Sequence, residues 1–223
     1  RHGNDPELYA GLVHACRYCG LFDESIAAHA EARRLDPNVP TSIEQTWLMD
    51  GNLDQLLAFE PPSLVAGADE GIRVIGLGLA DRRDEARRAL LRMRRAHIPA
   101  FQSWTEYLMA WLERRTEDMR ARMSVFDGLK IRDDPEAIFQ EGRFFCDVGE
   151  YRLGLDYLGR AISKGYWPLA TLHHAREFNG VRGDAAFQTT RLSDGQGHEI
   201  GIGHAAIATG QCERARRLVE RFI

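Results

Sequence analysis

The sequence predicts an all-α protein, and three observations lead to that class. Turn-forming residues recur at intervals of about 30 to 34 residues, starting with Gly20 and Gly51. The segments between them carry apolar residues at helical spacing, and none shows the alternation typical of half-buried strands. Each interval has room for two helices of about 12 to 14 residues and a short turn. We therefore expect an α-solenoid of stacked antiparallel helix pairs.

The predicted turns divide the chain in order. They fall at Gly20, Gly51, Asp81, Arg115, Gly149, Gly183 and Gly210. Glycine enters the left-handed conformation at little cost, so we expect it to end helices at 20, 51, 149 and 210. Three Asp-Pro pairs, Asp5-Pro6, Asp36-Pro37 and Asp134-Pro135, mark helix ends, because Pro suits a first turn and Asp accepts from free N–H groups. The most strand-like segment, VIGLGLA at 74 to 80, has helical spacing on both flanks and is predicted to be helical.

Composition excludes several classes of protein. The chain has 223 residues, of which 44% are hydrophobic and 28% charged, as expected of a folded chain with a core. A formal charge of -4 argues against nucleic acid or an anionic membrane as a partner. We find neither an apolar run that could span a bilayer nor a secretory signal pattern, and four scattered cysteines suit a reducing compartment. A cytoplasmic location is expected, and the start at Arg1 without Met suggests a longer chain.

Residues 5–38 carry a resemblance to a known family. Tyr9, Leu12, Val13, Cys16, Gly20, Phe22, Ser25, Ala32 and Pro37 fall on the packing positions of a tetratricopeptide repeat, which this segment resembles, with Val13 where Gly or Ala is usual. Residues 135–168 resemble the same motif through Gly142, Phe145, Gly149, Tyr151, Gly154 and Ala161. The resemblance implies one right-handed solenoid over residues 1–223. It has degenerate repeats at 39–65, 67–98, 101–132 and 167–192 and a terminal helix pair at 198–222.

A second, shorter resemblance lies at residues 172–190, LHHAREFNGVRGDAAFQTT. Arg182, Gly183, Asp184 and Phe187 are similar to the end of helical repeat regions attached to bacterial adenylate or guanylate cyclases, protein kinases and winged-helix regulators. This resemblance implies an accessory or regulatory part of a larger bacterial signalling protein.

Stacked helix pairs form a concave side lined by the first helix of each pair. The candidate groove residues on these helices are His14, Arg17, Gln45, Met49, Gln102, Met109, Glu113, Phe139 and Arg143. Their mixture of polar groups and apolar area suits a peptide, although each is equally compatible with contacts between repeats. A clamp for a terminal carboxylate, as in co-chaperones of this family, is disfavoured because Ala10 and His14 occupy its Lys and Asn positions.

A cluster of seven arginines lies within residues 82–95. Arg83, Arg87, Arg88, Arg94 and Arg95 form a candidate basic docking patch for an acidic partner domain or for a phosphate backbone, on the convex side of a second helix. The alternative is a solvated helix whose arginine stems cover the core.

Patterns that resemble catalytic or metal sites fail on their spacing. Cys16 and Cys19 have no second pair nearby, and Cys16 occupies a packing position, so a buried thiol is expected. His198 and His204 are too far apart for a metalloprotease helix, and His173 and His174 diverge on a helix. In GLGLAD at 76 to 81, small residues that allow close helix packing explain the glycines better than a dinucleotide loop.

We therefore expect a scaffold that binds a protein or peptide and has no catalytic activity, metal or cofactor. The alternative is a sensor domain that binds a small ligand around Trp104, Trp111 and Phe139.

Overall fold

The computed structural model describes residues 4–60, 68–95, 102–126, 133–185, 187–188, 212–213 and 217. Within these ranges the chain is all-α, which confirms the predicted class: eleven α-helices and a 3-10 helix, with no strand. The helices are α1 (Pro6–Tyr18), α2 (Phe22–Leu35), α3 (Ile43–Asp50), α4 (Leu53–Ala58), α5 (Ala68–Leu79), α6 (Arg83–Arg95), α7 (Gln102–Leu112), α8 (Thr116–Phe126), α9 (Pro135–Asp147), α10 (Tyr151–Ser163), α11 (Leu169–His174) and η3 (Arg176–Phe178).

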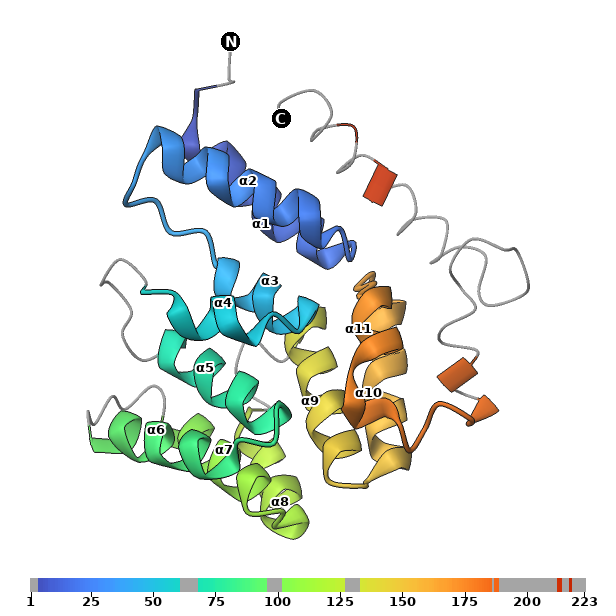
Figure 1. The fold of residues 1–223 in the computed structure, drawn as a ribbon. Helices are drawn as coiled ribbons and strands as arrows, with labels where there is room; N and C mark the ends of the chain where they lie inside the picture. The colour runs from blue at the N-terminus through green and yellow to red at the C-terminus, as the bar shows by residue number, and fades with distance from the viewer. Residues whose placement is uncertain are drawn as a thin grey trace.

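Successive helices pack as antiparallel pairs (Figure 1). The pairs α1/α2, α3/α4, α5/α6, α7/α8 and α9/α10 fall within the first five segments that the sequence analysis delimits. Within the described ranges, no helix is both long enough and apolar enough to cross a bilayer. Some predictions fall on residues that lie outside the described ranges or are covered only at isolated positions. They concern the terminal helix pair at 198–222, the turn at Gly210, and the residues His198 and His204.

A left-handed residue stands in the turn inside each of these five pairs. It is Gly20, Gly51, Asp81, Arg114 or Gly149, with φ of 68°, 78°, 63°, 56° and 90°. The residue that follows each of them donates its backbone N–H to the carbonyl five residues before it, as Leu21 does to Cys16 and Glu150 to Phe145. This hydrogen bond closes the end of the first helix of the pair. The left-handed glycines predicted at 20, 51 and 149 are thus confirmed. The fourth turn is centred on Arg114 instead of Arg115.

Two of the Asp-Pro pairs begin helices as predicted. Asp5 and Asp134 are N-caps whose carboxylates accept from the N–H groups of Glu7 and Glu136 at 3.1 and 2.9 Å. Asp36 instead ends α2, and its carboxylate accepts from Asn38 N–H in the following turn. All three pairs therefore mark helix boundaries, but only Asp5-Pro6 and Asp134-Pro135 begin a helix.

Glycines in α5 allow close packing with the neighbouring helices. A Cβ added to Gly78 would lie 2.3 Å from the Trp111 ring in α7, and one added to Gly71 would lie 2.1 Å from Trp104. At Gly76 the nearest atom would be Leu56 Cδ2 at 2.6 Å. The prediction that GLGLA is a helix whose small residues permit close contact is confirmed.

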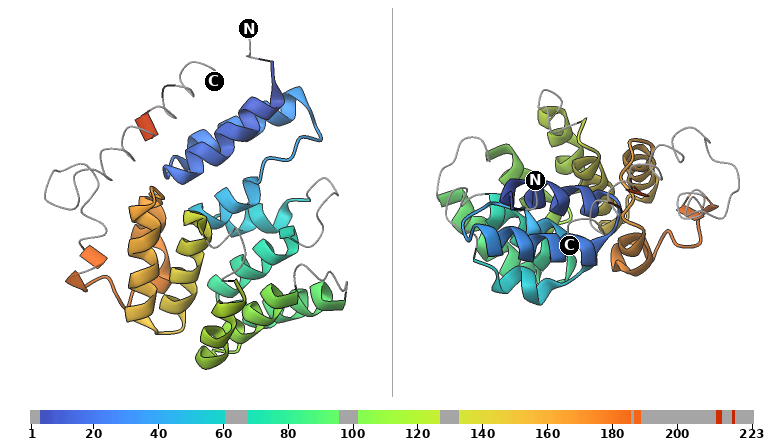
Figure 2. Two further views of the ribbon diagram at one scale, coloured as in Figure 1. Left: turned by 180° about the vertical axis from the view of Figure 1, so that it is seen from behind. Right: turned by 90° about the horizontal axis from the view of Figure 1, so that it is seen from above.

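The first helix pair also contacts a pair far along the chain. Arg17 at the end of α1 binds Glu136 at the start of α9, and the Tyr18 hydroxyl binds Asp134. The backbone N–H of Trp167 donates to the backbone carbonyl of Tyr18 at 2.9 Å. Figure 2 shows α1 beside the α9 and α10 end of the molecule from behind and from above. The arrangement therefore includes contacts beyond those between neighbouring pairs.

Asp147 makes a second long-range contact at the other end of α9. Its carboxylate accepts from Arg83 in α6 and from the Trp111 indole N–H in α7, the latter at 3.0 Å. The Arg83 guanidinium also lies over the Trp111 ring, 5.6 Å from its centroid. Together with the Arg17 contact, this fixes α9 against both earlier parts of the chain.

Candidate functional site

The structure separates the nine candidate groove residues into two groups. His14, Gln102 and Glu113 are exposed and Gln45 is partly exposed, whereas Arg17, Met49, Met109, Phe139 and Arg143 are buried. Phe139, for example, packs among Tyr166 and Phe178 in the core. Five of the nine side chains are therefore buried against neighbouring helices, which is the alternative that the sequence left open for each of them.

Arg17 is buried in an ion pair between α1 and α9. Its Nε donates to Glu136 Oε1 at 2.7 Å and its Nη2 to Oε2 at 3.0 Å. The Tyr166 hydroxyl donates to the same carboxylate at 3.0 Å. His14 Nδ1 lies 3.1 Å from Arg17 Nη2, and although part of the His14 side chain is exposed, desolvation of its ring and then the Arg17 charge lower its pKa. Arg17 therefore holds two helix pairs together.

Arg143 forms a second buried pair, with Glu177 of η3. Arg143 Nε donates to Glu177 Oε1 at 2.6 Å, and the two side chains are only 4% and 2% exposed. Arg143 Nη1 lies 3.3 Å from Met49 Sδ and 3.4 Å from Gln140 Oε1. The structure thus brings together Met49 and Arg143, two of the predicted groove residues.

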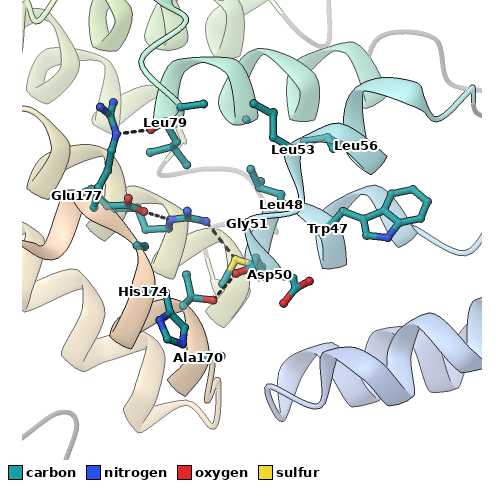
Figure 3. Close-up of a pocket in the computed structure, with 17 residues that line it drawn as sticks. Trp47, Leu48, Asp50, Gly51, Leu53, Leu56, Leu79, Ala170, His174 and Glu177 are labelled. Atoms are coloured by element: carbon teal, nitrogen blue, oxygen red, sulfur yellow. Dashed lines mark hydrogen bonds and ion pairs between the residues drawn. The ribbon is translucent and has the colours of Figure 1, made fainter.

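These two residues line a cavity of about 340 Å³ (Figure 3). It lies between α3, α4 and α5 on one side and α9, α11 and η3 on the other. Its apolar wall consists of Trp47, Leu48, Leu53, Leu56 and Leu79, and its polar residues are Asp50, Arg143, Thr171, His174, Arg176 and Glu177. An apolar wall with a few placed polar groups is typical of a binding site, and the volume lies at the lower end of the usual range of about 300 to 1,000 Å³.

Polar residues of the cavity wall are held by contacts between distant elements. The Thr171 hydroxyl donates to the Met49 carbonyl at 2.7 Å, which ties α11 to α3. Arg176 donates to the Leu79 carbonyl at the end of α5 and lies 3.5 Å from Asp81. Burial, and next the Asp23 charge, raise the pKa of Asp50. The wall is therefore assembled from both halves of the described chain.

The aromatic residues suggested for a small-ligand pocket are not in this cavity. Trp111 and Phe139 are completely buried in the core, and Trp104 packs against Gly71. Sequence reasoning did not select Trp47, Leu79, Thr171 or Glu177, which do line the cavity. No local pattern indicates them, because the cavity forms where α3 and α5 meet α11 and η3.

Two arginines of the candidate basic docking patch, Arg83 and Arg87, are engaged in ion pairs. Arg83 binds Asp147 and Asp81, and Arg87 lies within 3.7 Å of Asp84 and 4.0 Å of Glu113. The exposed members of the candidate basic docking patch are Arg88, Arg94 and Arg95. Two of the five proposed residues thus support the fold, which leaves a smaller exposed basic surface.

Two other features have structural explanations. Burial raises the pKa of Cys16 to about 12, so it is a buried thiol as predicted. Arg182 donates to the Ala175 carbonyl at 2.8 Å and to the His173 carbonyl, which closes the end of α11. Among the described residues, no group of three or more His, Cys, Asp and Glu side chains is placed to hold a metal ion.

Comparisons with models of known protein families, with curated proteins and with solved structures found no match to this chain.

Proposed function

We propose that this chain is a tetratricopeptide-like interaction module that binds a short segment of a partner protein at the cavity between α3–α5 and α11. The observation that carries the proposal is the cavity itself, where an apolar wall faces the buried Arg143–Glu177 pair. A wall of this kind accepts an apolar side chain, while the polar pair offers hydrogen bonds to the accompanying backbone.

The finer fold assignment belongs to the same proposal. Five helix pairs, each with a left-handed turn residue, support a right-handed solenoid of the tetratricopeptide type. The contacts of α1 with α9 are additional to the stacking of neighbours that such an array predicts. A regulatory role in a larger bacterial signalling protein, without catalytic activity of its own, completes the proposal and has its basis in the resemblance around Arg182.

The alternative function, a small-ligand sensor, is favoured by one observation. The cavity volume of about 340 Å³ suffices for a small molecule as well as for one or two peptide side chains.

Selection from a random peptide library displayed on phage tests the proposal directly. Ala170 lines the cavity, so Ala170→Trp fills it without changing any of its polar residues. Ala30→Trp is the matched control, because Ala30 is exposed on α2 and is not part of the lining. We expect selected peptides to bind the unmodified chain and Ala30→Trp but not Ala170→Trp. Peptides that bind all three equally would place the interaction elsewhere and refute the proposed site.

A further inference from the structure

The Arg143–Glu177 pair in the cavity wall uses only part of its hydrogen-bonding capacity. A guanidinium carries five N–H donors, and a carboxylate has about four acceptor positions. One strong bond joins Arg143 Nε to Glu177 Oε1, and Nη1 has only a thioether and a distant amide oxygen as acceptors. Within the ranges that the structure describes, Nη2 has no hydrogen-bond acceptor and Oε2 has no donor. The pair thus offers the cavity one donor nitrogen, Nη2, and one acceptor oxygen, Oε2.

The charge balance of the wall disfavours an anionic or cationic ligand. Arg143 and Glu177 offset each other, and the rest of the lining adds Arg176 and Asp50, one charge of each sign, with His174 as the remaining titratable side chain. An anion placed against Arg143 would also lie beside Glu177, and a cation placed against Glu177 would lie beside Arg143. Either would lose its hydration without gaining a net favourable charge. A neutral group that accepts and donates side by side avoids this cost.

An amide has this combination of groups. We propose that the cavity recognises an amide carried on an apolar body, with its oxygen accepting from Arg143 and its N–H donating to Glu177. The apolar body would lie against Leu48, Leu56 and Leu79 of the opposite wall. This inference deepens the proposed function and rests on it to the extent that the amide belongs to a peptide.

Three small probes of nearly equal size test the chemistry: 4-methylpentanamide, methyl 4-methylpentanoate and 4-methylpentanoic acid. All three have the same apolar body; the ester lacks the amide N–H, and the acid carries a negative charge. Leaving a buried donor or acceptor unpaired weakens binding, so we expect the amide to bind about tenfold or more tightly than either analogue. Titrations followed by NMR measure the three dissociation constants. Equal binding of amide and acid would overturn the inference.

Two variants separate this inference from a general apolar contact. Ala170→Trp should abolish amide binding, and Ala30→Trp should leave it unchanged. Glu177→Gln removes the negative charge and leaves Arg143 uncompensated, so the acid should then bind more tightly than the amide. A thermal unfolding curve checks that Glu177→Gln is folded; if it is not, the Ala170→Trp comparison and the three probes still decide.

The two proposals fail in different ways. Displayed peptides that bind through the cavity without any preference for amide over acid would refute the amide inference and leave the peptide-binding function standing. Binding of the amide probe with no displayed peptide selected would refute the peptide function and favour the small-ligand sensor. Retention of amide binding in Ala170→Trp would overturn the inference, because the cavity would not be the site.

Discussion

Replacing Gly78 by Ala should destabilise the protein although Ala favours helix formation. The added Cβ would lie 2.3 and 2.7 Å from two ring carbons of Trp111 and 2.9 Å from Leu112 Cδ2, closer than Cβ contacts in folded proteins. Trp111 has little freedom to shift, because it is completely buried and its indole N–H binds Asp147 at 3.0 Å. The clash must therefore be relieved by moving helix α5 or by breaking that hydrogen bond.

The magnitude follows from three contributions. Overpacking of a core costs about 1 to 3 kcal/mol. Loss of the indole hydrogen bond would add about 1 kcal/mol. Replacing a helical Gly by Ala offsets about 1 kcal/mol of this cost. We expect the free energy of unfolding to fall by about 1 to 3 kcal/mol.

Urea denaturation followed by circular dichroism measures this change, and Gly159→Ala is the matched control. Gly159 is exposed in α10, and a Cβ there would meet no atom within 4 Å. The control should therefore gain about 0.5 to 1 kcal/mol from helix propensity alone. If Gly78→Ala were as stable as Gly159→Ala, the close contact of α5 with Trp111 would be wrong.

Three further predictions concern charged residues. Arg17→Met should lower the free energy of unfolding by about 3 to 5 kcal/mol, because it leaves the Glu136 charge buried and unpaired. The double variant Arg17→Met with Glu136→Leu should lose less than the sum of the two single variants. Strict additivity in this double-mutant cycle would contradict the ion pair. Burial raises the pKa of Glu141 to about 7 from 4.5, with a smaller opposing contribution from Tyr107. The folded state therefore favours the neutral carboxyl. This contribution to the free energy of unfolding is fully present below pH 4.5 and is lost as the pH rises through 7, by about 3 kcal/mol in all. Between pH 4 and 8 the free energy of unfolding should therefore fall less steeply for Glu141→Gln than for the unmodified chain, and identical slopes would refute the shift. Asp5→Ala should cost about 1 kcal/mol through loss of the α1 N-cap, measured by urea denaturation, and no change would indicate that the Glu7 N–H is satisfied by water instead.

Local features of the fold could be predicted because their causes are local. A glycine after an apolar helical segment indicates a left-handed helix end by itself, so Gly20, Gly51 and Gly149 were identifiable in the sequence. The turn at Arg114 was placed one residue late, since neither Arg114 nor Arg115 has a side chain that favours positive φ. Asp36 precedes a Pro as Asp5 does, and only the surrounding structure decides that it ends a helix.

The candidate site could be predicted only in part, because it depends on contacts between distant residues. Helical spacing placed Arg17 and Arg143 away from the packing face, as is usual for charged residues. Their burial follows from Glu136 and Glu177, whose positions relative to the arginines are set by the tertiary fold. Met49 and Arg143 were selected as groove residues, but the other side of the cavity, at Thr171 and Glu177, has no signal in the sequence.

The ion pair between Arg17 and Glu136 fixes how many helix pairs can lie between α1 and α9. An open stack can gain or lose a unit at its end, since each unit contacts only its neighbours. Here, inserting one more pair anywhere between α2 and α9 would move Glu136 away from Arg17 and leave two buried charges without partners. Changes in the length of this chain over evolution should therefore occur outside the segment from α1 to α9, where they do not separate the two residues.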